Sequence, residues 1–220
     1  EDKIHIGKGT VINAGVILDA SKGSIIIDSN VIINSGSIIE GPTYIGNNSK
    51  ISPLSLIRSN TSIGPFCKIG GEVSCSIFQG YSNKVHHGFI GHSYIGEWVN
   101  LGANTNNSDL KNNYGLIQVI KDDQKIETGK QFLGTMMGDY SRTGISTMLN
   151  TGTIIGLGAN IFGAGFQDKY IPSFRWGKND ITELEKLFNT VENMKQRRGK
   201  SLNSDEKIFL TELYEKQIIK

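Results

Sequence analysis

The chain has 220 residues, which is enough for one large domain or for a domain with an appendage. Its formal net charge of +2 gives no reason to expect a nucleic acid or a membrane surface as partner, and no apolar run is long enough to span a bilayer. Two cysteines, Cys67 and Cys75, are too few for a disulfide framework and fit a reducing compartment, so we expect a cytoplasmic location.

A six-residue repeat runs through most of the chain. Aliphatic residues recur every six positions, and the residue two places earlier is small, as Thr43 is before Ile45. Residues two apart in an extended segment share a face, so both members of each pair should point inward. A helix would instead need recurrence at three and four residues. The two longest series are Ile45, Ile51, Ile57, Ile63 and Ile69, and then Met137, Thr143, Leu149, Ile155 and Ile161, with Thr143 as the polar exception.

This period predicts an all-β solenoid. A short strand and a corner every six residues wind the chain into a coil, and successive coils pair as parallel strands that bury each other's interior. Glycine often follows the aliphatic residue, as at Gly46 and Gly64, and gives the backbone freedom to turn. An ordinary β-sandwich is disfavoured, because its strand and turn spacing varies over about 8–12 residues.

The repeat stops twice. An insertion at 106–132 is predicted to form two short strands around a turn at 121–124. A C-terminal tail at 179–220 has helical spacing, with Asp180 as a plausible cap of the first helix and a second helix beginning near Ser204. We expect these helices to form a hairpin that caps the open end of the solenoid.

Three of the four histidines, His86, His87 and His92, lie within seven residues. His87 and His92 have an H-x4-H spacing similar to that of the γ-class carbonic anhydrases, which share the β-helix and hold zinc between subunits. That chemistry needs three imidazoles, and the only other histidine is His5. A zinc site is therefore a minor alternative, and we expect no metal in this domain.

The period and several motifs resemble a known family. The repeat is similar to that of hexapeptide-repeat, left-handed parallel β-helix acyltransferases, in which three hexads make one triangular coil. The segments NKVHHGFIGHS, GEWVNLGANTNNSDLKNNYG and FLGTMMGDYSRTGISTMLNTGT resemble the acetyltransferase half of bifunctional N-acetylglucosamine-1-phosphate uridyltransferases, and a GlmU-like group of sugar-1-phosphate nucleotidyltransferases. The resemblance implies a β-helix of about eight coils at 1–178, followed by the helical tail at 179–220.

The same resemblance implies site residues. Counting back from Ile90 and Gly91 puts His86 on the family's catalytic histidine, whereas counting forward from Lys84 would choose His87. The implied substrate-binding residues are Arg58, Lys84, Phe89, Asn100, Asp109 and Lys111. The implied coenzyme A-binding residues are Ala103, Ile145, Gly163 and Arg175, with Lys169 and Lys178 as further cations for its phosphates.

The implied activity is transfer of an acetyl group from acetyl-coenzyme A to an amino sugar or a sugar phosphate, in a homotrimer. A neutral imidazole suits this chemistry, because it can accept the proton that the attacking amine or hydroxyl loses near pH 7. The family's Asn-Tyr pair is replaced here by Asp109–Leu110. An alternative is therefore a non-catalytic, trimerising β-helix that regulates a sugar nucleotidyltransferase, whose own active site would lie in a domain outside this chain.

Overall fold

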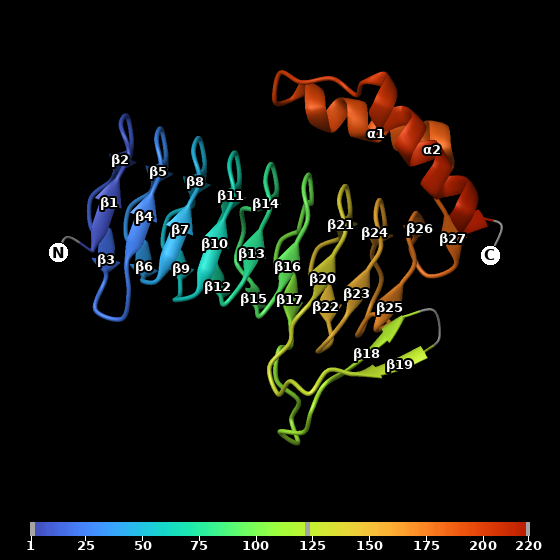
Figure 1. The fold of residues 1–220 in the computed structure, drawn as a ribbon, viewed down its shortest axis with the longest axis horizontal. Helices are drawn as coiled ribbons and strands as arrows, with labels where there is room; N and C mark the ends of the chain where they lie inside the picture. Colours follow the sequence, from blue (N-terminus) through green and yellow to red (C-terminus); the bar gives the residue numbers. More distant parts are fainter. Residues whose placement is uncertain (1–2, 122–123, 219–220) are drawn as a thin grey trace.

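The computed structural model describes residues 3–121 and 124–218. Most of the chain winds into a prism of stacked coils with three short strands in a full coil (Figure 1). The longest sheet, the first face of the prism, has nine parallel strands. In spatial order they are β1 (Ile4–Ile6), β4 (Ile25–Ile27), β7 (Thr43–Ile45), β10 (Thr61–Ile63), β13 (Ile77–Phe78), β16 (Tyr94–Ile95), β20 (Met136–Met137), β23 (Ile154–Ile155) and β25 (Tyr170–Ile171).

Two further faces complete the prism. The second face contains β2 (Val11–Ile12), β5 (Ile32–Ile33), β8 (Lys50–Ile51), β11 (Lys68–Ile69) and β14 (Asn83–Lys84), and continues through bridges at Asn100 to β21 (Arg142–Thr143), β24 (Asn160–Ile161), β26 (Arg175–Trp176) and β27 (Asp180–Ile181). The third face contains β3 (Ile17–Asp19), β6 (Ile38–Glu40), β9 (Leu56–Ile57), β12 (Glu72–Ser74) and β15 (Phe89–Gly91), followed by the pair β17 (Asn106–Asn107) and β22 (Met148–Leu149).

The interior contains the predicted pairs of small and aliphatic side chains. Ile33, Ile51 and Ile69 are in register on the second face and are fully buried. The small residues are buried too, and their hydroxyls satisfy backbone carbonyls of the next coil, as Ser49 Oγ donates to Gly64 O at 2.9 Å. The parallel β-helix predicted from the six-residue period is confirmed.

The coils are not uniform in length. Thr43 pairs with Thr61, 18 residues later, but Ser62 pairs with Ile77 only 15 residues later. Because several coils are shorter than three hexads, the first face holds nine strands where about eight coils were expected. The strict period is also lost in the middle of the chain for this reason.

The insertion forms the predicted antiparallel hairpin, β18 (Gln118–Lys121) and β19 (Gln124–Glu127). The expected turn residues 122–123 lie outside the described part of the chain. β17 still pairs with β22, so the backbone leaves the prism only after Asn107. The hairpin then lies against the later coils, with β18 contacting β23 and β25.

The tail forms two helices, α1 (Leu184–Gln196) and α2 (Ser204–Ile218). The start near Ser204 is confirmed, but the expected cap at Asp180 is wrong. Asp180 and Ile181 form strand β27, antiparallel to β26, and Glu183 takes the N-cap position of α1. The free edge of β26 accounts for this difference, because it offers backbone partners that an isolated helix start lacks. Neither helix in the described residues is long and apolar enough to cross a membrane.

The helical hairpin lies along a side of the prism rather than across its end (Figure 1). The corner between the first and second faces, which we call the first corner, holds aromatic residues of several coils in the left-handed backbone region. Tyr81 stacks on Trp98, with ring centroids 4.3 Å apart, and Trp98 is buried in one cluster with Leu187 and Val191 of α1. The expectation of an end cap is therefore wrong: the apolar face of α1 meets an aromatic surface at the first corner.

Candidate functional site

The corner between the second and third faces, the second corner, collects residues that are far apart in sequence. The backbone N–H of Asn104 donates to His87 O at 2.9 Å, and that of Ser146 donates to Ala103 O at 2.7 Å. Gly144 in turn donates to Ile161 O, just before Gly163. His86, Ala103, Ile145 and Gly163 therefore follow one another along one edge, in successive coils about 4.8 Å apart.

Two adjoining grooves lie at the second corner. His86 is exposed and lines a groove of about 350 Å³ together with Leu54 and Val85. His87 is exposed as well and lines both this groove and a second one of about 400 Å³, which also contains Glu72 and Phe89. The geometry thus gives each imidazole access to solvent and to space for a ligand.

At the far end of this edge lies a cleft of about 270 Å³. Its lining includes Gly163, Arg175 and Lys178, three of the residues implied for coenzyme A, and the aromatic side chain of Phe162. Lys169 is directed elsewhere, because its Nζ donates to Gln118 O in the hairpin at 3.4 Å. The second corner therefore connects the two histidines at one end with a partly cationic cleft at the other.

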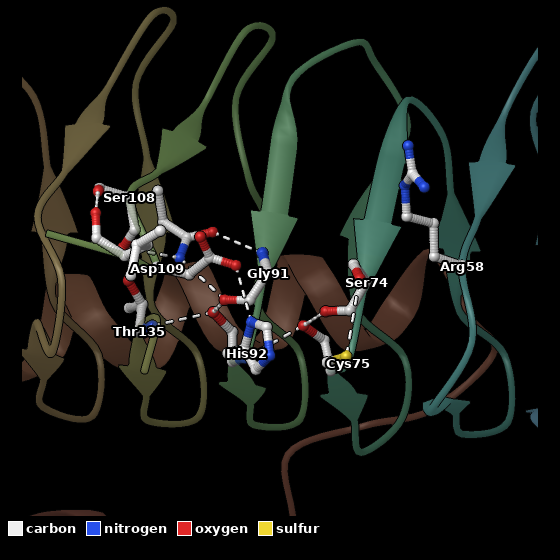
Figure 2. Close-up of polar contacts among 12 residues, drawn as sticks. Arg58, Ser74, Cys75, Gly91, His92, Ser108, Asp109 and Thr135 are labelled. Carbon is white, nitrogen blue, oxygen red and sulfur yellow. Dashed lines mark hydrogen bonds and ion pairs between the residues drawn. The ribbon is translucent and has the colours of Figure 1, made fainter. Parts of the chain in front are cut away.

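The third histidine has a partner that sequence reasoning missed. His92 Nδ1 lies 2.7 Å from Asp109 Oδ2, and the Phe132 ring lies 5.0 Å from the imidazole between centroids. Figure 2 shows this pair at the corner between the third and first faces, which we call the third corner, with Ser74 and Cys75 of the preceding coil beside it. A carboxylate on one ring nitrogen orients the imidazole and leaves the other nitrogen able to exchange a proton.

Coil geometry explains this pairing. His92 and Asp109 are 17 residues apart, close to one coil, so they stack at the third corner. Gly91 makes the approach possible, since a Cβ there would overlap both Asp109 Oδ2 and the Phe89 ring. The spacing was a usable signal in the sequence, but it required knowing that this coil is one residue shorter than three hexads.

The implied sugar-binding residues are distributed over two faces. Phe89 is half-buried on the third face, with its ring edge against Gly91. Arg58 Nε donates to Glu72 Oε1 at 2.7 Å, and Figure 2 shows Arg58 on another coil, apart from the contact between His92 and Asp109. Asn100, by contrast, is exposed on the second face.

Two lysines are held by backbone carbonyls. Lys84 is buried, and its Nζ donates to the carbonyls of Gly70, His86 and Gly88 at 2.7–3.1 Å. Burial lowers the pKa of Lys84 to about 8. Lys111 Nζ donates to Leu116 O within the insertion. Lys84 therefore stabilises the loop that carries His86, whereas its contact with a substrate stays a prediction.

The zinc alternative needs three close ligands. His87 lies at the second corner and His92 at the third, so the H-x4-H pair does not converge. Across residues 3–121 and 124–218, no group of three or more His, Cys, Asp or Glu side chains is placed to hold a metal ion.

Comparisons with known proteins agree with this fold. No family model matches the chain. A bifunctional sugar-1-phosphate nucleotidylyltransferase/acetyltransferase of Sulfurisphaera tokodaii is 37% identical over 143 residues, which is 64% of this chain and 36% of the relative. The bifunctional protein GlmU of Buchnera aphidicola is 32% identical over 183 residues, which is 70% of this chain and 36% of the relative. The chain spans about a third of the length of these relatives, and the resemblance predicted from the motifs is confirmed.

A solved structure has the same architecture. It is a crystal structure of a Bacillus cereus protein assigned as an acetyltransferase, and it matches with a TM-score of 0.51 at 15% identity. The match covers 89% of this chain and 97% of that protein. At this level of identity the likeness concerns the fold.

Proposed function

We propose that this chain transfers an acetyl group from acetyl-coenzyme A to an amino sugar or a sugar phosphate. The observation that carries the proposal is the second corner, where His86, Ala103, Ile145 and Gly163 occupy consecutive coils of one edge. One relative, which matches 64% of this chain, is named a bifunctional sugar-1-phosphate nucleotidylyltransferase/acetyltransferase, and another, which matches 70%, is named the bifunctional protein GlmU. Any nucleotidyl transfer would belong to a domain outside this chain.

The donor would lie along the second corner. An extended pantetheine arm suits an edge of stacked corners, because the coils offer backbone groups at regular intervals of about 4.8 Å. Its phosphates would then reach the cleft that contains Arg175 and Lys178, where both cations line the same space. This orientation brings the thioester to the end of the edge where His86 lies.

The exposed imidazole of His86 would act as general base. The acceptor's amine or hydroxyl attacks the thioester carbonyl carbon and gives its proton to the imidazole, the carbon–sulfur bond breaks, and the leaving thiolate is protonated. A backbone N–H at a coil corner would stabilise the oxyanion. No covalent intermediate on the protein is required.

The acceptor would contact residues on either side of the second corner. Phe89 and Glu72 line the groove that also contains His87, and Glu72 holds Arg58 by an ion pair. Asn100 lies on the opposite side, on the second face. Because these residues face outward on two sides of the prism, a site that uses all of them would be completed by a neighbouring prism, as in a homotrimer.

The pair His92–Asp109 supports a second choice of base for the same reaction. It is the one histidine among the described residues whose ring nitrogen is paired with a carboxylate. Orientation by a carboxylate is a common arrangement for a catalytic imidazole. The two choices predict different effects of substitution, so one series of variants separates them.

The test incubates the chain with acetyl-coenzyme A and glucosamine-1-phosphate and follows the release of free thiol. If His86 is the base, His86→Ala lowers kcat/KM by at least about 100-fold, whereas His87→Ala and His92→Ala change it only a few-fold. His5→Ala, at an exposed position of β1, is the matched control. Sedimentation of each variant checks that the oligomer is unchanged.

Other results lead to other conclusions. Loss of turnover confined to His92→Ala and Asp109→Asn would transfer the role of base to His92. An inactive wild-type chain, across several amino sugars and sugar phosphates, would contradict acetyl transfer and favour the non-catalytic, trimerising β-helix.

A further inference from the structure

A second cleft lies between the second face and the helical hairpin. Its volume is about 380 Å³, and its walls include Lys68 and Arg142 from the β-helix and Arg197 and Arg198 from the link after α1. The link reaches back over earlier coils (Figure 1), where Arg198 Nη2 donates to Asn83 Oδ1 at 2.9 Å. Residues more than 100 positions apart thus place four cationic side chains around one space. We call this space the basic cleft.

These four cations lack carboxylate partners. The ion pairs among the described residues involve Arg58, His92, Lys186 and Lys195, none of which lines the basic cleft. Among the described residues, the Arg198 guanidinium has one hydrogen-bond partner, the neutral side-chain amide of Asn83. Cationic side chains gathered without counter-charges are unfavourable unless an anion neutralises them.

Arg142 is the most constrained of the four. Its Nε is buried and has no hydrogen-bond partner in the structure, although a buried N–H is normally satisfied. The guanidinium remains charged at any ordinary pH. An N–H donor in this state is suited to an anionic oxygen.

The electrostatics point the same way. The positive charge of Arg198 is the main cause that lowers the pKa of Lys68, and burial lowers the pKa of both Arg142 and Arg198. Each lowered pKa means that the positively charged form of the side chain is less stable in the basic cleft than in water. An anion in the basic cleft would oppose these shifts, because an opposite charge favours the charged form of each cation.

Two acidic side chains near the helical hairpin have partners of their own. Glu206 pairs with Lys195 and accepts from Tyr140, and Asp139 Oδ1 accepts from the backbone N–H of Glu97. None of the described residues that line the basic cleft is acidic: besides the four cations they are Tyr81, Asn83, Val85, Trp98, Asn100 and Met194. The protein therefore does not supply its own counter-ion to the basic cleft.

We infer that the basic cleft binds a small molecule carrying a diphosphate group. Four cations match the two to three negative charges of a diphosphate, and guanidinium groups bind phosphate oxygens through paired N–H donors. A cleft of this size, in a chain with a net charge of only +2, fits a small anion better than a nucleic acid or a membrane surface. The inference goes beyond the proposed acetyl transfer. The basic cleft shares Val85 with the groove of His86 and Asn100 with the proposed acceptor site, but its four cations belong to neither.

The test measures binding of inorganic pyrophosphate by isothermal titration calorimetry, in a phosphate-free buffer of low ionic strength without an acetyl donor. We expect one site per chain, and weakening by about tenfold or more in Arg142→Gln and in Lys68→Gln. The matched control is Lys8→Gln, which removes one positive charge from an exposed position in the first coil and should leave the dissociation constant within about twofold.

A second arm identifies the source of the diphosphate. If a uridine diphosphate binds more tightly than pyrophosphate and is weakened by the same substitutions, the natural ligand carries a nucleoside. Equal affinities would indicate that the diphosphate alone is recognised. Each variant is also melted thermally, because a loosened helical hairpin could itself weaken pyrophosphate binding. Both Lys68 and Arg142 lie on the β-helix, outside the hairpin, so neither substitution alters the hairpin's own sequence.

Two results would overturn the inference. One is absence of pyrophosphate binding to the wild type at millimolar concentration. The other is equal affinity in Arg142→Gln, Lys68→Gln and Lys8→Gln, which would show attraction by overall charge. If the wild type binds no anion and Arg142→Gln changes the sedimenting mass, the cleft accommodates acidic groups of a second copy instead.

Discussion

At the scale of single residues, Lys84 shows how a charged side chain can occupy a position that isoleucine fills in other coils. It is in register with Ile69, which is in register with Ile51, so a lysine occupies a place in the buried isoleucine series. Its aliphatic stem fills that place, and its ammonium reaches three carbonyls at the second corner. A charge inside the prism is retained because each of its N–H donors has an acceptor.

We predict that Lys84 makes stability depend on pH. Its pKa is about 8 in the folded chain and near 10.5 when unfolded, so between these values the unfolded state binds more protons. The free energy of unfolding should therefore rise with pH from about 8 to about 10.5. Urea titrations at several pH values measure the free energy of unfolding of the wild type and of Lys84→Met. The wild type should show this rise with pH, and the variant should lack it.

The substitution should also cost stability near neutral pH. Lys84→Met keeps most of the length of the side chain but leaves three carbonyls without their donor. We therefore expect the free energy of unfolding to fall by about 1–3 kcal/mol. A variant as stable as the wild type at pH 7, with an unchanged pH profile, would contradict the role assigned to this lysine.

At the scale of elements, the helical hairpin and the first corner form one packing unit. Leu187, Val191 and Leu210 are buried against Trp98 and other aromatic residues of the corner. Lys195 of α1 is buried as well, and it pairs with Glu206 of α2. The hairpin thus holds the link with Arg197 and Arg198 in place over the second face.

We predict that this packing contributes measurably to folding. Leu187→Ala should lower the free energy of unfolding by about 2–4 kcal/mol, because the side chain is fully buried and leaves a cavity. Ile208→Ala, on the exposed side of α2, should change it by less than about 0.5 kcal/mol. Chemical denaturation measures both, and equal effects would mean that the hairpin is not docked as described.

At the scale of the whole molecule, the prism is a one-dimensional stack in which each coil is covered by its neighbours. The coils are therefore unequal. Ile4 and Ile6 of β1 are 37% and 50% exposed, whereas Ile25 and Ile27 of β4, one coil further, are 0% and 1% exposed. Stability in such a stack depends on contacts between nearest neighbours.

We predict a gradient of amide exchange along the stack. In the chain of residues 1–220, amides of β1 should exchange with deuterium faster than amides of β10, because β1 has a paired strand on one side only. Hydrogen–deuterium exchange read by mass spectrometry resolves the two segments. Equal protection of β1 and β10 would contradict the nearest-neighbour description, unless sedimentation shows that a second copy covers β1.

The local repeat determined most of the fold. The inward pairs, such as Thr43 with Ile45, require only that residues two apart share a face, and the same rule in each hexad builds the prism. The hairpin strands and the second helix are also local patterns, and the structure confirms them. The alignment of His86, Ala103, Ile145 and Gly163 followed from the motif resemblance together with the period.

Contacts between distant segments were decided only in three dimensions. The pairing of His92 with Asp109 depends on a coil of 17 residues, and no single hexad reveals that length. The basic cleft depends on α1 turning back along the aromatic first corner, which brings Arg198 to Asn83 across more than 100 residues. Local sequence specifies strands, corners and helices because their forces act between near neighbours. The sites arise where coil length and helix docking bring remote side chains together, and these are properties of the assembled stack.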